Sequence, residues 1–127
     1  AGSDDFFEQE RAGLLAYIEY LRANPAHARL VEETRLHDPE LAALGVENWS
    51  DQFLARVHAG IKRGLIPPME DSEIRTQGLF VLGAYSVFDR LLQAKSYPGD
   101  TAVADAFIGL LRNGLGFFSE KPNPAPT

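Results

Sequence analysis

The chain has 127 residues, of which 45% are hydrophobic and 24% charged, the size and composition of one globular domain. Its 18 Asp and Glu residues outnumber its 12 Lys and Arg residues, and the resulting net charge of −6 argues against a nucleic-acid-binding surface, because phosphate contacts need clustered basic side chains. The sequence contains no cysteine, which excludes disulfides, thiolate nucleophiles and thiolate metal sites.

The first predicted helix covers "SDDFFEQERAGLLAYIEYLRAN", with Ser3 or Asp4 as its N-cap and acidic residues in its first turn. Apolar residues recur along it at helical spacing. The helix is expected to end at Asn24, because a residue that precedes proline avoids the α-helical region. Pro25 is then predicted to begin a second helix, "PAHARLVEETRLH".

The dipeptide Asp38-Pro39 predicts another helix start, with a capping aspartate followed by proline at the first helical position. A short helix, "DPELAALG", is expected there, with a bend near Gly45. A longer helix is predicted from Val46 to Arg63, and "RGLIPPMEDSE" after it is the strongest break in the chain. Four apolar residues of the longer helix recur every four positions: Trp49, Phe53, Val57 and Ile61.

Two long helices are predicted in the last part of the chain, separated by "SYPGD". The fourth helix begins at Asp71 or Ser72 and ends near Lys95. The fifth begins at Asp100 or Thr101 and ends near residue 118.

The predicted fold class is all-α, a five-helix or six-helix orthogonal bundle, because no stretch alternates apolar and polar residues as a strand would. Residues 5–118 are expected to form the helical domain. Residues 1–4 are expected to be a tag or disordered, and residues 119–127 a disordered, proline-rich tail.

The fourth and fifth predicted helices are apolar around most of their circumference, and residues 78–88 carry no formal charge. A helix that is apolar all round must be buried all round, and a domain of this size cannot easily enclose two of them. We therefore expect the two helices to form a four-helix bundle with a second copy of the chain. The alternative is one central helix buried within a monomer. The candidate dimer interface residues are Gly78, Leu82, Gly83, Phe88, Leu92, Phe107, Leu110, Leu111 and Gly114.

The order of these segments resembles a known family. "YLRANPAHARLVEE", a "DPEL" helix, "LARVHAGIKRGLIPPMEDSEIRTQGLFVLGAYSVFDRLLQ" and a last amphipathic helix are similar to the effector-binding and dimerisation domain of TetR-family transcriptional regulators. The resemblance covers residues 5–118. It implies a homodimer, a small-molecule effector that controls DNA binding allosterically, and a cytoplasmic protein, with which the absence of cysteine is compatible. DNA is expected to be contacted only through an N-terminal helix-turn-helix domain that this chain lacks.

By the same resemblance, the ligand cavity lies between the first three helices and the start of the fourth. Apolar walls with a few polar groups suit such a cavity, and Tyr and Trp supply both. The alternative is that these aromatic side chains only fill the core. The candidate ligand-binding residues are Tyr17, Tyr20, Trp49, Gln52, Phe53, Phe80 and Tyr85.

The sequence predicts no catalytic residue, no metal site and no cofactor. Glu33 and His37 stand four residues apart, but a zinc site needs three or four ligands, and His27 and His58 do not complete one in the sequence. The charged residues of the second helix are expected to form a solvated face with modest ion pairs: Arg29, Glu32, Glu33 and Arg35.

Three functional hypotheses remain open. The first is a ligand-sensing, dimerising regulatory domain that binds a small, largely apolar molecule and no membrane. The second is a helical protein-interaction module without a small-molecule site. The third is an enzyme, which is the weakest because the sequence assembles no acid–base or nucleophile constellation.

Overall fold

The computed structural model describes the backbone of residues 5–117 and the side chains of residues 5–114. This part contains six α-helices and no strand, so the all-α class is confirmed. The predicted cap at Ser3 or Asp4, the expectations for residues 1–4 and the tail at 119–127, and the predicted helix end near residue 118 lie outside the described residues. The six helices are α1 (Phe6–Ala23), α2 (His27–His37), α3 (Pro39–Lys62), α4 (Asp71–Tyr85), α5 (Phe88–Gln93) and α6 (Asp100–Phe117).

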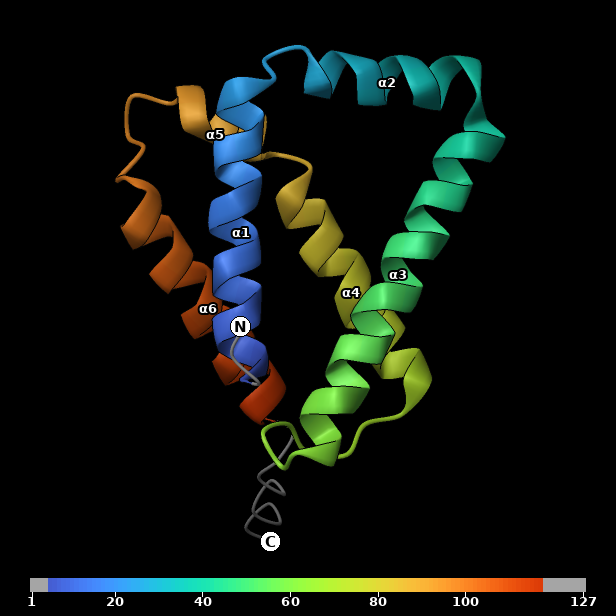
Figure 1. Cartoon of the computed structure of the whole chain (residues 1–127), viewed down its shortest axis with the longest axis vertical. Coiled ribbons are helices and arrows are strands. Elements are labelled where there is room, and N and C mark those ends of the chain that lie inside the picture. The colour runs from blue at the N-terminus through green and yellow to red at the C-terminus, as the bar shows by residue number, and fades with distance from the viewer. Residues whose placement is uncertain (1–4, 118–127) are drawn as a thin grey trace, which may run out of the picture.

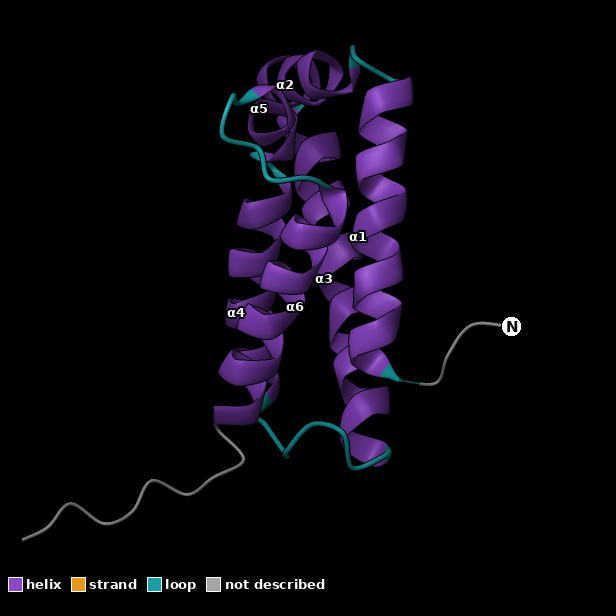
Figure 2. Cartoon of the chain, turned by 90° about the vertical axis from the view of Figure 1, so that its left-hand side faces the viewer, coloured by secondary structure: helices purple, strands orange, loops and turns teal. Residues whose placement is uncertain are grey.

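Helices α1, α3, α4 and α6 run along the long axis of the molecule, and α2 lies across one end (Figure 1). Helix α1 packs against α6 and α3, and α3 packs against α4 and α2. Figure 2 shows the same arrangement from the side, with α5 and α2 at the same end of the molecule, remote from the start of α1. Helix α2 therefore connects α1 to α3 across one end of the molecule.

Local sequence explains two of the helix starts. The Asp5 side chain accepts a hydrogen bond from the Phe7 amide at 2.8 Å and caps α1. Asp38 accepts one from the Leu41 amide at 3.1 Å and caps α3, with Pro39 at the first helical position as predicted. Helix α2 begins at His27 instead of Pro25, and its N-cap residue makes no side-chain hydrogen bond.

The predicted division near Gly45 into a short and a longer helix is wrong, because α3 is one continuous helix from Pro39 to Lys62. The stretch around Gly45 consists mostly of Ala, Leu and Glu, which are strong helix formers. One glycine in a helix interior costs only about 1 kcal/mol, which is too little to interrupt a capped helix of this length.

The predicted helix from residue 71 to residue 95 is also wrong, because it is two helices, α4 and α5. The Ser86 hydroxyl donates a hydrogen bond to the Gly83 carbonyl at 2.6 Å, and the Val87 amide donates to the Ala84 carbonyl three residues back. A serine that bonds to its own helix backbone and a tightened last turn both favour termination. The break allows Phe88 to be buried in the core.

The core consists of two clusters that meet at Tyr85 and Phe107, which pack against both. The first cluster joins α1, α3, α4 and α6 around Phe53, Val57 and Ile74. The second joins α1, α5 and α6, and its buried residues are Leu14, Ile18, Leu21, Phe88 and Ala104.

We call residues 27–48, which comprise α2 and the first part of α3, the arch. None of its side chains is buried. Several of them are apolar and exposed all the same, including Leu36 and Leu44, which are exposed to about 60%. The arch is therefore held by its ends and by limited contact between α2 and α3, not by a core of its own.

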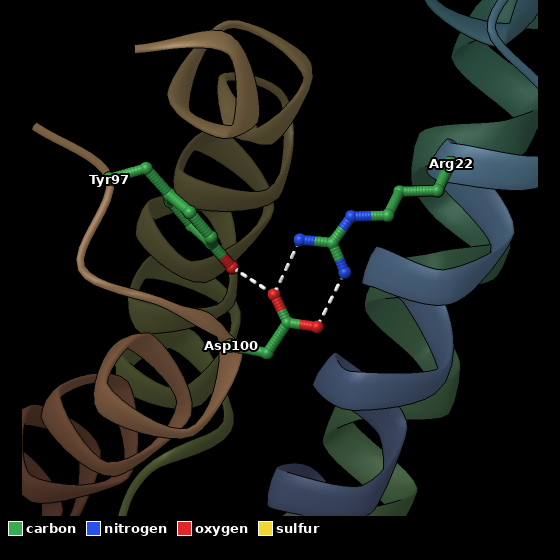
Figure 3. A network of polar contacts seen from close by, with 3 residues as sticks. All are labelled: Arg22, Tyr97 and Asp100. Carbon is green, nitrogen blue, oxygen red and sulfur yellow. Dashed lines mark hydrogen bonds and ion pairs between the residues drawn. The ribbon is translucent and has the colours of Figure 1, made fainter. Parts of the chain in front are cut away.

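A polar network joins the end of α1 to the start of α6 (Figure 3). The Arg22 guanidinium donates to both carboxylate oxygens of Asp100, one of them at 2.6 Å, and the Tyr97 hydroxyl donates to the same carboxylate. These bonds lower the pKa of Asp100 to about 2, first through Arg22 and then through Tyr97. Such a network fixes the register of α1 against α6.

None of the described helices combines the length and the apolar character that a membrane crossing needs.

Candidate functional site

A cleft of about 950 Å³ lies between the arch and helices α1, α3 and α4. This volume is in the upper part of the range of about 300–1,000 Å³ that is typical of small-molecule sites. Residues from all four elements line it. The cleft exists because α2 crosses the end of the molecule and holds the first part of α3 away from α1.

The cleft is mostly apolar. In the arch, Leu30 and Val31 keep more than half of their surface exposed although they face this cleft. An apolar molecule placed there would remove this surface from water, which is favourable by roughly 25 cal/mol per Å². The large apolar side chains that line the cleft are Leu30, Val31, Leu41, Val46, Trp49 and Leu82.

Aromatic rings form one side of the cleft. The Tyr17 and Tyr85 rings make an edge contact with centroids 5.0 Å apart, and Trp49 stacks on Phe53 with centroids 5.2 Å apart. The Tyr17 hydroxyl donates a long hydrogen bond of 3.5 Å to the Tyr85 carbonyl. Burial raises the pKa of Tyr85 to about 12 and also raises the pKa of Tyr17, so both phenols stay protonated at neutral pH.

Charged and polar side chains also line the cleft. The Glu10 side chain, only 4% exposed, accepts a hydrogen bond of 2.6 Å from Arg56 Nε. His27, at the start of the arch, lies 3.2 Å through Nδ1 from the Tyr20 hydroxyl. The cleft thus offers an ion pair, a histidine and two phenols among apolar side chains, which is the composition expected of a ligand pocket. Its remaining polar lining residues are Gln9, Thr34, Arg35 and Ser86.

The structure brings three of the seven candidate ligand-binding residues to the cleft: Tyr17, Trp49 and Tyr85. The other four lie elsewhere. Phe53 is buried and stacks on Trp49, Gln52 is exposed on α3, and Tyr20 contacts His27 without lining the cleft. Phe80 lies in a different groove, because it faces away from α3 on α4. Whether the three cleft residues bind a ligand stays a prediction.

This second groove, of about 300 Å³, lies between α4 and α6. Phe80 on α4 and Leu110 on α6 line it and are 76% and 74% exposed. Leu79, also on α4, is 55% exposed. The outer surface of this helix pair is therefore apolar and exposed within the part of the chain that the structure describes.

The candidate dimer interface residues divide into two groups. Phe107, Leu110, Leu111 and Gly114 line the groove, and Gly83 is exposed on α4. The other four do not line the groove. A Cβ on Gly78 would meet the Phe53 ring at 2.9 Å, Leu82 lines the cleft, and Phe88 and Leu92 belong to the second core cluster.

Sequence reasoning missed the Glu10–Arg56 pair and the inner surface of the arch. Glu10 lies four residues from Phe6 and from Leu14, so it is an acid on the apolar stripe of α1. A charged side chain at such a position needs a partner of opposite charge, so the position of Glu10 in the sequence could have indicated a buried ion pair. The arch residues carried no such signal, because apolar side chains on a short amphipathic helix are normally predicted to face the core.

The expected solvated face of α2 is confirmed. Arg29 pairs with Glu33 at 3.7 Å and Arg35 pairs with Glu32, and all four side chains are more than half exposed. Within the described residues, no three His, Asp or Glu side chains converge in a way that could hold a metal ion.

No protein-family model matches the chain, and neither a curated protein nor a solved structure is significantly similar to it. The cleft and the groove are therefore the features of this chain that bear on its function.

Proposed function

We propose that the chain is the effector-sensing and dimerisation domain of a TetR-like transcriptional regulator, and that the cleft binds a small, largely apolar molecule. The observation that supports this most is the cleft itself, about 950 Å³ lined by four helices with apolar and aromatic side chains. In a regulator of this kind, DNA binding belongs to a helix-turn-helix domain outside the present chain. Such a protein acts in the cytoplasm.

The arch and α4 supply the coupling in this proposal. A ligand in the cleft contacts the arch on one side and Leu82 and Tyr85 of α4 on the other. Helix α4 also carries Phe80, which lines the groove to α6. A change in the position of α4 therefore reaches both sites. The ligand shifts the equilibrium only by its difference in affinity for the two arrangements.

A second copy of the chain covers the groove between α4 and α6 in this proposal. Phe80 and Leu110 are about three-quarters exposed, and apolar patches of this kind on a protein surface mark interaction sites. A two-fold axis beside the groove brings the same two helices of each copy together as a four-helix bundle.

Binding of the neutral fluorescent probe N-phenyl-naphthylamine tests the ligand site. Trp49 is the only tryptophan of the chain and lines the cleft, so energy transfer from it reports a bound probe. We expect saturable binding at micromolar probe. The double variant Gly13→Leu, Gly45→Leu should weaken it at least tenfold, because a Cβ at either glycine meets open space on the cleft wall. Ala43→Leu, exposed on α3 and not among the lining residues, is the matched control.

Absence of saturable binding, or equal binding by the double variant, would contradict the ligand site. The interaction module without a small-molecule site would then be the better explanation of the apolar surfaces.

Light scattering after size-exclusion chromatography tests whether two copies of the chain associate. We expect a dimer at micromolar concentration and a monomer for the double variant Phe80→Glu, Leu110→Glu, since both side chains are exposed in the single chain and charge there should not disturb its core. Leu44→Glu, 60% exposed in the arch, is the control and should remain a dimer. A monomeric unchanged protein would overturn this part of the proposal.

A further inference from the structure

The wall of the cleft contains one nearly buried charge. Glu10 on α1 is 4% exposed, and Arg56 on α3 donates to it through Nε at 2.6 Å. Arg56 itself keeps about a third of its side chain exposed, and its guanidinium lies over the Phe53 ring at 5.7 Å. Both residues line the cleft.

The pair leaves donors unused. A guanidinium has five N–H donors, and Nε supplies one of them to Glu10. Neither Nη of Arg56 makes a hydrogen bond to any residue that the structure describes. A ligand in the cleft can therefore receive hydrogen bonds from Arg56 without breaking its bond to Glu10.

The charges that line the cleft are already compensated. Glu10 neutralises Arg56, and the other lining arginine, Arg35, is paired with Glu32 on its own helix. An anionic ligand would bring a third charge beside a balanced pair in an apolar site, and a cationic one would lie next to Arg56. Burial of an uncompensated charge is expensive, whereas a neutral acceptor only has to replace its hydrogen bonds to water.

We propose, on the basis of the function proposed above, that the effector is a neutral, largely apolar molecule with a carbonyl-type acceptor that binds the free Nη groups of Arg56. Tyr17 and Trp49 contact its apolar body on the same wall. Glu10 holds the guanidinium in place and sets the charge preference of the site against carboxylates.

Three matched naphthalenes test this inference by displacement of N-phenyl-naphthylamine. They carry an acetyl, an ethyl or a carboxylate group at the same ring position, so they differ in the acceptor and the charge but little in shape. We expect the acetyl compound to bind about tenfold more tightly than either of the others, which is the usual effect of one hydrogen bond to a charged group.

Two variants test whether Glu10 and Arg56 cause the preference for the acetyl compound. In the double variant Glu10→Leu, Arg56→Met, which removes both charges and leaves neither unpaired, the acetyl and ethyl compounds should bind equally. In Glu10→Gln, where the amide oxygen can still accept from Arg56, the carboxylate compound should gain about tenfold because the guanidinium is no longer neutralised. Circular dichroism of both variants shows that they fold.

The outcomes separate this inference from the function on which it rests. If the probe does not bind at all, the ligand site itself is wrong and the inference falls with it. If the probe binds but the unchanged protein prefers the carboxylate compound, or the double variant keeps the acetyl preference, only the role of Glu10 and Arg56 is overturned.

Discussion

The two ends of α3 lie in different environments. Toward its C-terminal end, Phe53 and Val57 are at most 1% exposed and pack with Ile74 in the first core cluster. In the arch, at its N-terminal end, no side chain is buried. The same helix therefore contributes to the core in one half and to the wall of a cleft in the other.

The difference indicates that some apolar residues of the chain stabilise its core and others are left to bind a ligand. Apolar side chains of the core are already removed from water and stabilise the folded chain. Those of the arch remain exposed, so their burial is still available to a ligand. We expect substitutions in the core to change stability, and substitutions on the inner surface of the arch to change binding.

Truncation of a core side chain should have the largest effect. Phe53→Ala is expected to lower the free energy of unfolding by about 3–5 kcal/mol, because it leaves a cavity between α3 and α4. Leu44→Ala in the arch should change it by less than about 0.5 kcal/mol. Denaturant unfolding measures both, and similar losses for the two would contradict the division between core and arch.

Substitution of two glycines by alanine should change the stability of the chain in opposite directions. Gly78→Ala places a Cβ 2.9 Å from the Phe53 ring and should destabilise the chain by about 1–3 kcal/mol through overpacking. Gly45→Ala in the arch meets nothing within 4 Å and should stabilise it by about 0.5–1 kcal/mol through helix propensity. Thermal unfolding gives the comparison, and a loss at Gly45 would show that the arch is packed more tightly than the structure has it.

Substitution of two neighbouring alanines should distinguish a position that lines the cleft from one that does not. Ala42 lines the cleft and Ala43 is exposed and not among the lining residues. Ala42→Phe is expected to weaken binding of N-phenyl-naphthylamine about tenfold, equivalent to about 1.4 kcal/mol, while Ala43→Phe leaves it unchanged. Fluorescence titration measures the affinity. Equal effects of the two variants would mean that the probe binds elsewhere.

The smallest effect on stability is expected when the pH is lowered. The pKa of Asp100 is lowered from 3.8 to about 2 by Arg22 and then Tyr97, so its contribution to stability is complete above the ordinary pKa and is lost as the pH falls through about 2. The pair is partly exposed, and solvent reduces the effect. Asp100→Asn should flatten the fall in melting temperature between pH 4 and pH 2, and an unchanged slope would contradict the role of this network.

Much of the fold could be predicted from local chemistry. Asp38-Pro39 specifies the start of α3 because the cap and the fixed φ of proline act within a few residues. The break after Tyr85 could not be predicted, because "YSVFDRLL" continues the apolar pattern of a helix. The local bonds of Ser86 and Val87 favour the break, but its benefit, the burial of Phe88 against α1 and α6, is a contact with residues far away in the sequence.

The site was predictable only in part for the same reason. Helical spacing placed Trp49 and Phe53 on one face, but only Trp49 lines the cleft, whereas Phe53 is buried in the core against α4. Glu10 and Arg56 are 46 residues apart, and their pairing follows from the contact of α1 with α3.

Hydrogen exchange with and without N-phenyl-naphthylamine tests most directly the claim that the arch lacks a core of its own and is stabilised by a ligand. In the free protein, amides of residues 27–48 should exchange much faster than those around Phe53 and Ile74, because an arch without buried side chains opens without unfolding the core. The probe should slow exchange in the arch and leave the core almost unchanged. Arch amides that are as protected as the core in the free protein, or that do not respond to the probe, would contradict the account.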